Sequence, residues 1–451
     1  MEKDLRITDT QYLLALTIFF LSYAIFEVPS NVFLKRLRPS LWLSGLMFCW
    51  GIMMTVQGLV HNFGGLMGMR WMLGMFEAGL YPGVTYYLSC WYKRSEFGIR
   101  VALFFSAATV SGAFGGLLAA AISNMDGIGT CFSWPVKSHP QTFAWLGGKP
   151  AWAWIFILEG LATVVAGALS FFIIQDFPDT AKFLTEAERT VVVRRLQGDD
   201  QFSAAGEQLR MKYIYKSILD WKTWVGMMIY AGLDMPLYAF SLFLPSIINQ
   251  VRFKATPANL LTVPVYFFAC VITCGVGFFA DRWGMRGYFN LIFLCIGAAG
   301  YIILIASRNA ALSYFAVYLA TCGIYPVIPN TVAWVANNVE GSYKRSVTLA
   351  MVIGFGNING AVSSNVYRAD QQPWYPLGES LVLLYIGLGL VFSFIYLIFL
   401  RRENARRNRG ERNEIIGGDK SSGHEVNGRY DTVDDAKRDK GDEWSGYRYI
   451  L

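Results

Sequence analysis

Long apolar runs recur along this chain and limit its possible folds more than any other feature of the sequence. Windows of about 19 residues pick out about eleven runs, each long enough for an α-helix to cross the hydrocarbon core of a bilayer. The runs cover residues 12–34, 41–59, 64–87, 101–123, 151–173, 223–247, 260–280, 288–307, 312–336, 346–366 and 379–400. Only 16% of the residues are charged, against about a quarter in soluble proteins. We therefore predict an all-α membrane protein with about eleven transmembrane helices.

Short basic clusters between the runs predict which ends of the helices face the cytoplasm. They alternate with connections that are nearly free of charge, such as His61-Asn62. The basic clusters lie at residues 35–38, 93–100, 281–286 and 344–345 and in the stretch that begins at Arg401. We expect this side and the C-terminus to be cytoplasmic, in a multi-pass protein of the plasma membrane. The formal charge of +7 then reflects membrane topology, and we expect no nucleic-acid partner.

Cysteine and histidine are placed unlike metal ligands or catalytic groups. The seven cysteines lie mostly within apolar runs and show no metal-ligand spacing. The three histidines, His61, His139 and His424, all fall outside the runs. We therefore expect no metal, no cofactor and no enzymatic activity.

The two halves of the chain resemble each other at a nearly constant offset of about 245 residues. Residues 78–82 (AGLYP) recur as 322–326 (CGIYP), and residues 31–38 align with 277–284. A repeat with the same orientation in both halves predicts two pseudo-symmetric helical bundles. The predicted parts are an N-terminal bundle of five helices (1–173), a cytoplasmic linker (174–222), a C-terminal bundle of six helices (223–402) and a charged, glycine-rich, disordered tail (403–451).

The repeat also predicts two irregularities in the first half. A run in the first half that matched residues 223–247 would precede Met1. We therefore expect the first half to lack its opening helix. Residues 130–147 have no periodicity and no counterpart in the second half, which makes them an unusual insert. A faulty gene model and a real truncated variant with a long external loop both explain these features, and the sequence leaves the two alternatives open.

One loop and four longer stretches resemble a known transporter group. Residues 277–286 (GFFADRWGMR) fit the G-x-x-x-D-R-x-G pattern of major facilitator transporters and lie between two runs on the basic side. The stretches 26–40, 80–100, 237–250 and 323–345 resemble the fungal anion:cation symporters, which include allantoate, nicotinate and pantothenate permeases, and are most similar to the nicotinic acid permeases. The resemblance implies a major facilitator fold with twelve helices, of which about eleven are present. We expect Gly277, Asp281, Arg282 and Gly284 to form a gating loop between the bundles.

Charged residues inside the runs are candidates for a transport site, because each costs about 2.5–3.5 kcal/mol at mid-bilayer. Arg70 and Glu77 lie two turns apart on one face of a helix. The guanidinium of Arg70 can bind a substrate carboxylate in a bidentate way, and Glu77 can exchange a proton beside it. In similar anion symporters, an Arg and a Glu at matching positions have these roles. A static ion pair between two helices would explain the same pattern.

Other polar residues complete the predicted site. Asp234 precedes Pro236, which breaks the helix ladder and favours a cavity-lining segment, so we assign Asp234 to proton coupling with Glu77. Asn330 and Asn357 are candidates for hydrogen bonds to the substrate, and Tyr238 for stacking on an aromatic one. Bridging between helices or ordinary packing would account for these three residues as well.

Two further carboxylates, Glu27 and Glu159, have a structural role as their preferred interpretation. Together these features predict a secondary active transporter for proton-coupled uptake of a small organic anion, nicotinate-like or another vitamin or carboxylate. Its partners would be the anion, protons and membrane lipid, and we expect a monomer. Two alternatives remain, an exporter of a secondary metabolite and a non-transporting sensor or inactive truncated transporter.

Overall fold

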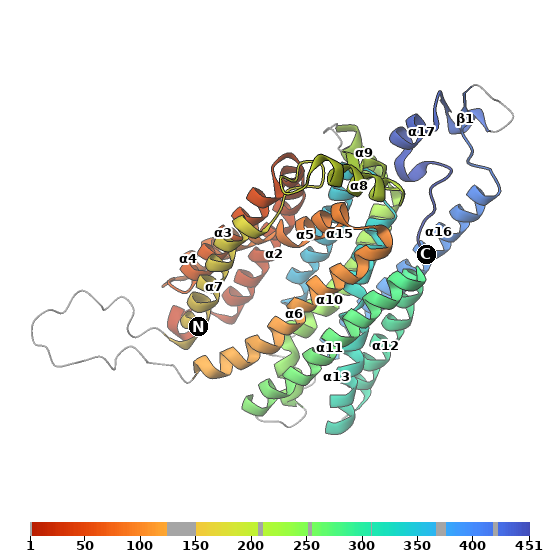
Figure 1. Cartoon of the computed structure of the whole chain (residues 1–451). Coiled ribbons are helices and arrows are strands. Elements are labelled where there is room, and N and C mark those ends of the chain that lie inside the picture. Colours follow the sequence, from red (N-terminus) through yellow and green to blue (C-terminus); the bar gives the residue numbers. More distant parts are fainter. Residues whose placement is uncertain are drawn as a thin grey trace, which may run out of the picture.

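The computed structural model describes residues 2–123, 150–205, 211–250, 255–307, 309–366, 376–417 and 423–451. Its long helices run roughly alongside one another (Figure 1). The predicted insert at 130–147 lies outside the described residues.

Helices make up nearly all of the described chain. The first half contains α1 (Glu2–Leu5), α2 (Asp9–Arg36), α3 (Pro39–Gln57), α4 (Phe63–Glu77), α5 (Leu80–Trp91), α6 (Arg94–Ser123) and α7 (Ala151–Ile173). The linker contains α8 (Glu186–Gln197), η1 (Phe202–Ala205) and α9 (Met211–Leu219). The second half contains α10 (Trp221–Gln250), α11 (Ala255–Trp283), α12 (Arg286–Ala306), α13 (Ala310–Ile324), α14 (Val327–Asn337), α15 (Ser342–Ser363) and α16 (Pro376–Asn408). The tail contains β1 (Ile415–Ile416), η3 (Glu425–Asn427), β2 (Arg429–Tyr430), α17 (Val433–Lys440) and η4 (Gly441–Glu443), and its two short strands pair in parallel.

Eight helical segments in the described part of the chain are long and apolar enough to cross a membrane. They are α2, α3, α7, α11, α12, α13 together with α14, α15 and α16. The other three predicted runs also fall on helices, namely α4 with α5, α6 and α10. The predicted all-helical membrane architecture is therefore confirmed, whereas the count of about eleven crossings stays a prediction.

One span in each half is interrupted at the repeated pentapeptide. α4 ends at Glu77 and α5 begins at Leu80, within AGLYP. α13 ends at Ile324 and α14 begins at Val327, within CGIYP. The proline that closes each pentapeptide lacks the amide hydrogen that would continue the helical ladder. The same break thus recurs at the offset of the repeat, which supports an internal duplication.

The helices form two groups that meet along two related seams. In the first group α2 packs on α4, and α3 packs on α4 and α7. In the second group α10 packs on α15 and α16, and α12 packs on α13 and α16. Between the groups, α6 packs along α11 and α2 packs along α15. Because the repeat matches α2 with α11 and α6 with α15, each seam is the pseudo-symmetric copy of the other.

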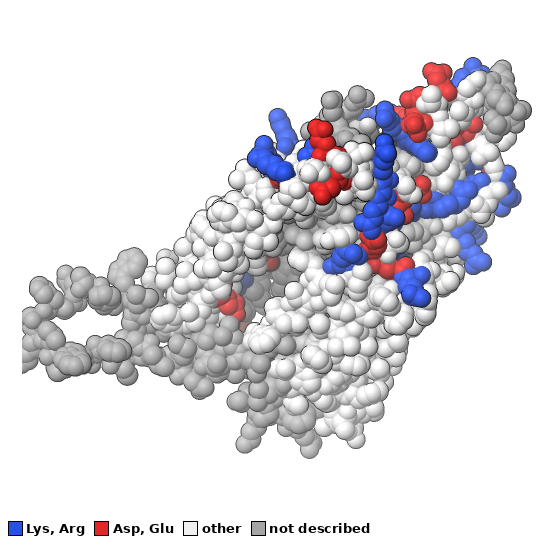
Figure 2. Space-filling view, in the orientation of Figure 1, with Lys and Arg blue, Asp and Glu red and all other residues white. Residues whose placement is uncertain are grey.

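Charge distinguishes the two ends of the molecule. Lys and Arg side chains gather at the end that carries α8, α9 and α17, and we call this the basic end (Figure 2). The same view shows a recess between the two helix groups, away from the basic end, in which a few charged side chains are visible. The helix groups are thus closed together at the basic end and hollowed between their other parts.

The tail differs from the disorder expected for residues 403–451. α16 continues to Asn408, and the last residues of the chain fold against the basic end. Asp442 is fully buried and forms ion pairs with Lys222, at the start of α10, and with Lys344, at the start of α15, the second at 2.9 Å. The charged composition of the tail predicted a solvated segment. Asp442 nevertheless pairs with lysines at the starts of two helices that are distant in the sequence.

Charge and aromatic contacts both stabilise the docked tail. Burial alone would raise the pKa of the Asp442 carboxyl, but Lys222 and Lys344 hold that pKa well below its usual range. The Tyr447 hydroxyl donates to the carbonyl of Asn337 at 2.7 Å, at the end of α14. The tail is therefore anchored on the ends of α10, α14 and α15.

Replacing Asp442 with Asn tests this anchor. The substitution removes one of the two carboxylates that Lys222 and Lys344 share, the other being Asp220. We therefore expect the free energy of unfolding to fall by about 1.5–3 kcal/mol, the value of a hydrogen bond to a charged group. Thermal unfolding of the full-length protein in detergent, followed by tryptophan fluorescence, measures the loss. The control is Asp434→Asn, because the side chain of Asp434 is 83% exposed and only loosely paired. Equal melting temperatures for the two variants would contradict the anchor.

Candidate functional site

A chain of hydrogen bonds connects the two helix groups near the middle of their spans. The Tyr238 hydroxyl on α10 donates to Asn357 Oδ1 on α15 at 2.8 Å. Asn357 Nδ2 in turn donates to Glu27 Oε2 on α2 at 3.1 Å. Glu27 is fully buried, although its carboxylate lies in an apolar helix of the other group. We call these three residues, together with Asp234, the central cluster.

Asp234 is the second buried carboxylate of the central cluster. It lies one helical turn before Tyr238 on α10 and is 2% exposed. A Cβ at Gly356 would stand 3.2 Å from Asp234 Oδ2, so glycine allows α15 to approach this carboxylate closely. Asp234 Oδ2 and Glu27 Oε1 both lack a hydrogen-bond partner among the described residues. Buried carboxylate oxygens in this condition are costly unless they bind a proton or a ligand.

Arg70 and Glu77 lie on α4, which packs against α2. Both side chains are half-buried. The Arg70 guanidinium lies over the ring of Phe156 on α7, 5.8 Å from its centroid, and Arg70 Nε has no hydrogen-bond partner among the described residues. The Glu77 carboxylate lies close to the Trp50 side chain. No ion pair joins Arg70 and Glu77, both of which are described, so the guanidinium is not held by this carboxylate.

Asn330 lies apart from the central cluster. Its Nδ2 donates to Asn290 Oδ1 at 2.7 Å and to the carbonyl of Arg286 at 2.9 Å. Arg286 Nη1 donates to Asn330 Oδ1 at 3.4 Å. These bonds engage its amide in a network at the basic end, away from Tyr238 and Asn357, and its assignment to the substrate site stays a prediction. α14 begins directly after Pro326 and buries this amide.

The predicted gating loop does join the two helix groups. Asp281, at the end of α11, accepts hydrogen bonds from the amides of Gly98 at 3.2 Å and Ile99 at 2.7 Å, near the start of α6. Because these amides lie near the N-terminal end of α6, the carboxylate also interacts favourably with the dipole of that helix. Asp281 forms an ion pair with the buried Arg286 as well. A Cβ at Gly98 would overlap the Arg286 guanidinium and stand 2.5 Å from Asp281 Oδ1, so any larger residue has to displace these side chains.

Both glycines of the loop have identifiable roles. A Cβ at Gly277 would be 2.6 Å from the Cβ of Ala102, so glycine lets α11 touch α6. Gly284 has a φ of +64°, a conformation that favours glycine and turns the chain from α11 into α12. Arg282 is exposed, whereas the side chain of Arg286 is 1% exposed and pairs with Asp281. The described partner of Asp281 is thus Arg286, which closes the same ten-residue stretch, and a gating role for Arg282 stays a prediction.

The other seam has a matching contact. Asn31 Nδ2 on α2 donates to the carbonyl of Ser346 on α15 at 3.1 Å, and Ser346 Oγ donates to the carbonyl of Asn31 at 3.3 Å. Asn31 occupies the repeat position of Gly277. The first-half loop has lost the acidic pattern of the second but still fastens its helix to the opposite group.

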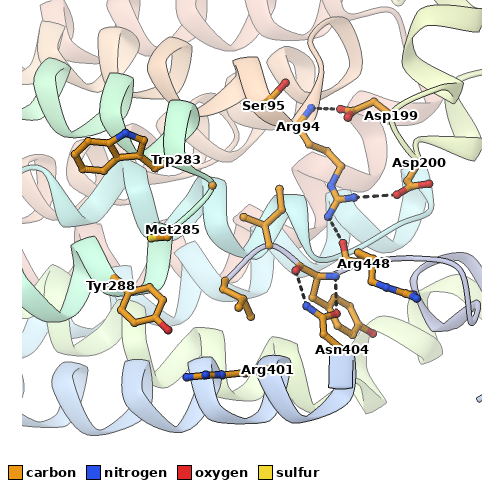
Figure 3. A pocket seen from close by; sticks show the side chains of 14 residues that line it. Arg94, Ser95, Asp199, Asp200, Trp283, Met285, Tyr288, Arg401, Asn404 and Arg448 are labelled. Atoms are coloured by element: carbon orange, nitrogen blue, oxygen red, sulfur yellow. Dashed lines mark hydrogen bonds and ion pairs between the residues drawn. The ribbon is translucent and has the colours of Figure 1, made fainter. Parts of the chain in front are cut away.

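The linker and the tail meet the first helix group at Arg94, beside a cavity of about 630 Å³ (Figure 3). The amide of Arg94 donates to Asp199 Oδ2 at 2.5 Å, and its guanidinium approaches Asp200 at 3.4 Å. The guanidinium also donates to the carbonyl of Arg448 at 2.8 Å and stacks over the ring of Tyr447 at 4.5 Å. Sequence reasoning missed Arg94, because its partners are a loop and a tail that have no recognisable motif.

Comparison with known proteins identifies the family. Residues 1–364 match the sequence model of the Major Facilitator Superfamily. The chain belongs to the major facilitator superfamily. It is 33% identical over 411 residues to the MFS transporter prlL of Fungal sp. (strain NRRL 50135), which covers 90% of this chain and 78% of the relative. It is 27% identical over 407 residues to the high-affinity nicotinic acid transporter of Saccharomyces cerevisiae, covering 90% of this chain and 72% of the relative.

A solved structure supports the same fold. The proton:xylose symporter XylE, bound to 6-bromo-6-deoxy-D-glucose, superposes with a TM-score of 0.62 at 15% identity. The match covers 85% of this chain and 84% of XylE, and at this identity it shows the fold alone. This major facilitator protein is accordingly a multi-pass membrane protein of a transporter family.

Gly98→Ala tests the gate. The added methyl would overlap Arg286 and crowd Asp281, so α6 and α11 should separate at the basic end. We expect a several-fold faster reaction of the Cys90 thiol, which lines a small cavity at this end with Lys35 and Arg345, with a water-soluble maleimide. Peptide mass mapping distinguishes Cys90 from the other cysteines. Gly115→Ala on the same helix has open space around its Cβ and serves as the control. An unchanged rate for Gly98→Ala would contradict the proposed role of this contact.

Proposed function

We propose that this major facilitator protein takes up a small organic anion together with a proton, by alternating access between its two helix groups. The observation that carries the proposal is the half-buried guanidinium of Arg70, which forms no ion pair with any described carboxylate, together with the buried carboxyl groups of Glu27 and Asp234 in the central cluster. A cation and two carboxyl groups inside a membrane protein each need a reason, and transport of an anion with a proton provides one for all three.

Arg70 is the proposed substrate ligand. Its guanidinium keeps its charge at all relevant pH values and offers a planar, bidentate match to a carboxylate. The ring of Phe156 contacts one face of the guanidinium, which leaves the N–H groups at its edge for a ligand. A nicotinate-like substrate agrees with the relative that is named a high-affinity nicotinic acid transporter. Tyr238, whose ring packs edge-on against Phe20 at 4.8 Å, offers an aromatic surface for such a substrate.

Glu77 and Asp234 remain the proposed proton-coupling groups, and Glu27 joins them. Glu27 bridges to the second helix group through Asn357, so its charge lies in the seam that closes and opens. An ionised carboxylate is costly in a closed, water-poor seam, whereas a protonated one is tolerated. Proton loading would therefore favour closure around the substrate, and proton release on the other side would allow the seam to reset.

The closed contacts indicate which state of the cycle this structure represents. Asp281 fastens α11 to α6, and Asn31 fastens α2 to α15, both at the basic end. The recess between the groups lies away from that end (Figure 2). With the basic end in the cytoplasm, as the loop charges predict, this is the state that receives substrate from outside.

Arg70→Ala tests the substrate site. Labelled nicotinate uptake is measured in a host that lacks its own nicotinate transporter, at external pH 5 and pH 7.5. We expect uptake at pH 5 to exceed that at pH 7.5, and Arg70→Ala to lower it about 10- to 100-fold, the value of a charge-assisted hydrogen bond of about 1.5–3 kcal/mol. The exposed Arg36→Ala is the control. Uptake that is changed neither by the external pH nor by Arg70→Ala would exclude this mechanism. Net efflux from preloaded cells would instead indicate an exporter.

Neutral amide variants test the proton path. In Glu27→Gln, Glu77→Gln and Asp234→Asn, we expect the ratio of uptake at pH 5 to uptake at pH 7.5 to fall towards one in at least one variant. Exchange of labelled for unlabelled substrate, which needs no net proton movement, should persist in the same variant. Glu159→Gln is the matched control, because Glu159 is half-buried on α7 and outside the central cluster. An undiminished pH ratio in all three variants would remove these carboxylates from the coupling mechanism.

A further inference from the structure

A second cavity at the basic end belongs neither to the transport site nor to the gate. Its volume is about 600 Å³, and it lies between the start of α10, the end of α16 and the tail. One part of its lining is apolar and consists of Trp221, Val225, Ile395 and Phe399. The other part is charged and consists of Arg402, Glu403, Arg406, Arg407, Arg412, Lys440 and Glu443. The apolar run of α16 ends immediately before its first arginine, so the two parts lie on either side of the membrane edge.

Positive charge in this cavity exceeds negative charge, and two arginines are nearly unused. Glu403 is engaged by Arg412 at 2.8 Å and by Arg407 at 3.4 Å. Arg402 is exposed and makes no hydrogen bond or ion pair with any described residue. Arg406 has only a distant contact, 4.0 Å from Glu411, and its side chain is 53% exposed. The cavity thus presents one unpaired and one loosely paired guanidinium group on the part of α16 that leaves the membrane.

The apolar half of the cavity continues onto the outer surface of the helices. The rings of Trp221 and Phe399 lie 5.5 Å apart, and these side chains are 39% and 50% exposed. Tryptophan at the end of a membrane span commonly lies at the level of the lipid headgroups. An acyl chain entering from the bilayer can therefore cover this surface while its headgroup stays beside the arginines.

We propose that this cavity binds the headgroup of an anionic phospholipid from the leaflet at the basic end. Phosphate oxygens would accept bidentate hydrogen bonds from Arg402 and Arg406, and the acyl chains would lie against Trp221 and Phe399. Clusters of four to eight basic residues directly after a membrane span are typical of sites for anionic lipids. A free phosphate would use the same arginines but would leave the apolar half uncovered, which favours a lipid.

Binding of the lipid would also affect the docked tail. Lys440, Glu443 and Tyr449 line the same cavity, and they flank Asp442, which anchors the tail on α10 and α15. A bound headgroup joins α16 to this segment. Lipid binding is therefore expected to stabilise the docked tail and, with it, the closed basic end.

The test uses the full-length protein, purified in a neutral detergent and stripped of native lipid. Short-chain phosphatidylinositol 4-phosphate is titrated, and binding is followed by tryptophan fluorescence and by the shift in melting temperature. We expect saturable binding that phosphatidylcholine does not reproduce. Inorganic phosphate and inositol phosphate are titrated separately, and binding of either one as tight as that of the lipid would overturn a lipid site in favour of a free anion.

Two double variants separate a built site from general attraction to basic charge. Arg402→Ala with Arg406→Ala removes both of these guanidinium groups, and we expect lipid binding to weaken at least tenfold. Arg401→Ala with Arg409→Ala removes the same charge from the same segment, but neither residue lines this cavity, so binding should stay within twofold of the unmodified protein. Equal weakening in both pairs, or unchanged binding in the first pair at an unchanged melting temperature, would overturn the proposal.

Discussion

The carboxylate of Asp281 is the contact on which the closed basic end depends most. It accepts amide hydrogen bonds from Gly98 and Ile99 and pairs with Arg286, so one side chain fastens α11 to α6 and also holds the start of α12. The contact requires α6 and α11 to approach each other closely, which the absence of side chains at Gly98 and Gly277 permits. Near the same end, the other seam is held by Asn31 and Ser346, which use neutral hydrogen bonds. At the basic end the α6–α11 contact is therefore charged and the α2–α15 contact is neutral, so protonation of Asp281 or loss of Arg286 would weaken only the first.

The tail adds a third connection at this end, and it depends on buried charges that match one another. Asp442 lies between Lys222 and Lys344, and Lys344 also pairs with Asp220 at 2.6 Å. These lysines stand at the starts of α10 and α15, the two helices that carry the central cluster farther along. The carbonyl of Arg448 completes the connection by accepting from Arg94, the first residue of α6. The tail thus contacts both helix groups, and moving the groups apart at the basic end has to break some of these contacts.

Features governed by local or periodic rules could be read from the sequence, and contacts between distant segments could not. Apolar runs located the helices, and the repeated pentapeptide located a break that recurs in both halves, because both depend on residues within a few turns. The G-x-x-x-D-R-x-G pattern located the contact between α11 and α6 but not the arginine that pairs with Asp281. Arg282 is exposed and Arg286 is buried, and only the packing of the helices decides this difference. Asn330 and the tail show a related limit. An amide or a carboxylate looks free in sequence until its partners from other helices are known, and for Asp442 those partners lie in α10 and α15.

Glu27 shows how the same limit bears on mechanism. The sequence favoured a structural role for it, yet Glu27 is fully buried inside α2. There it meets Asn357 of α15, and α15 also carries Ser346 and Lys344 near its start. A helix is stiff over this length, so a change in the charge of Glu27 that shifts α15 against α2 would also act on the contact between Asn31 and Ser346 and on the tail anchor. The central cluster and the basic end are thus connected through one continuous helix. Under the proposed mechanism of proton-coupled alternating access, the seam around Glu27 and the contacts that close the basic end would move together.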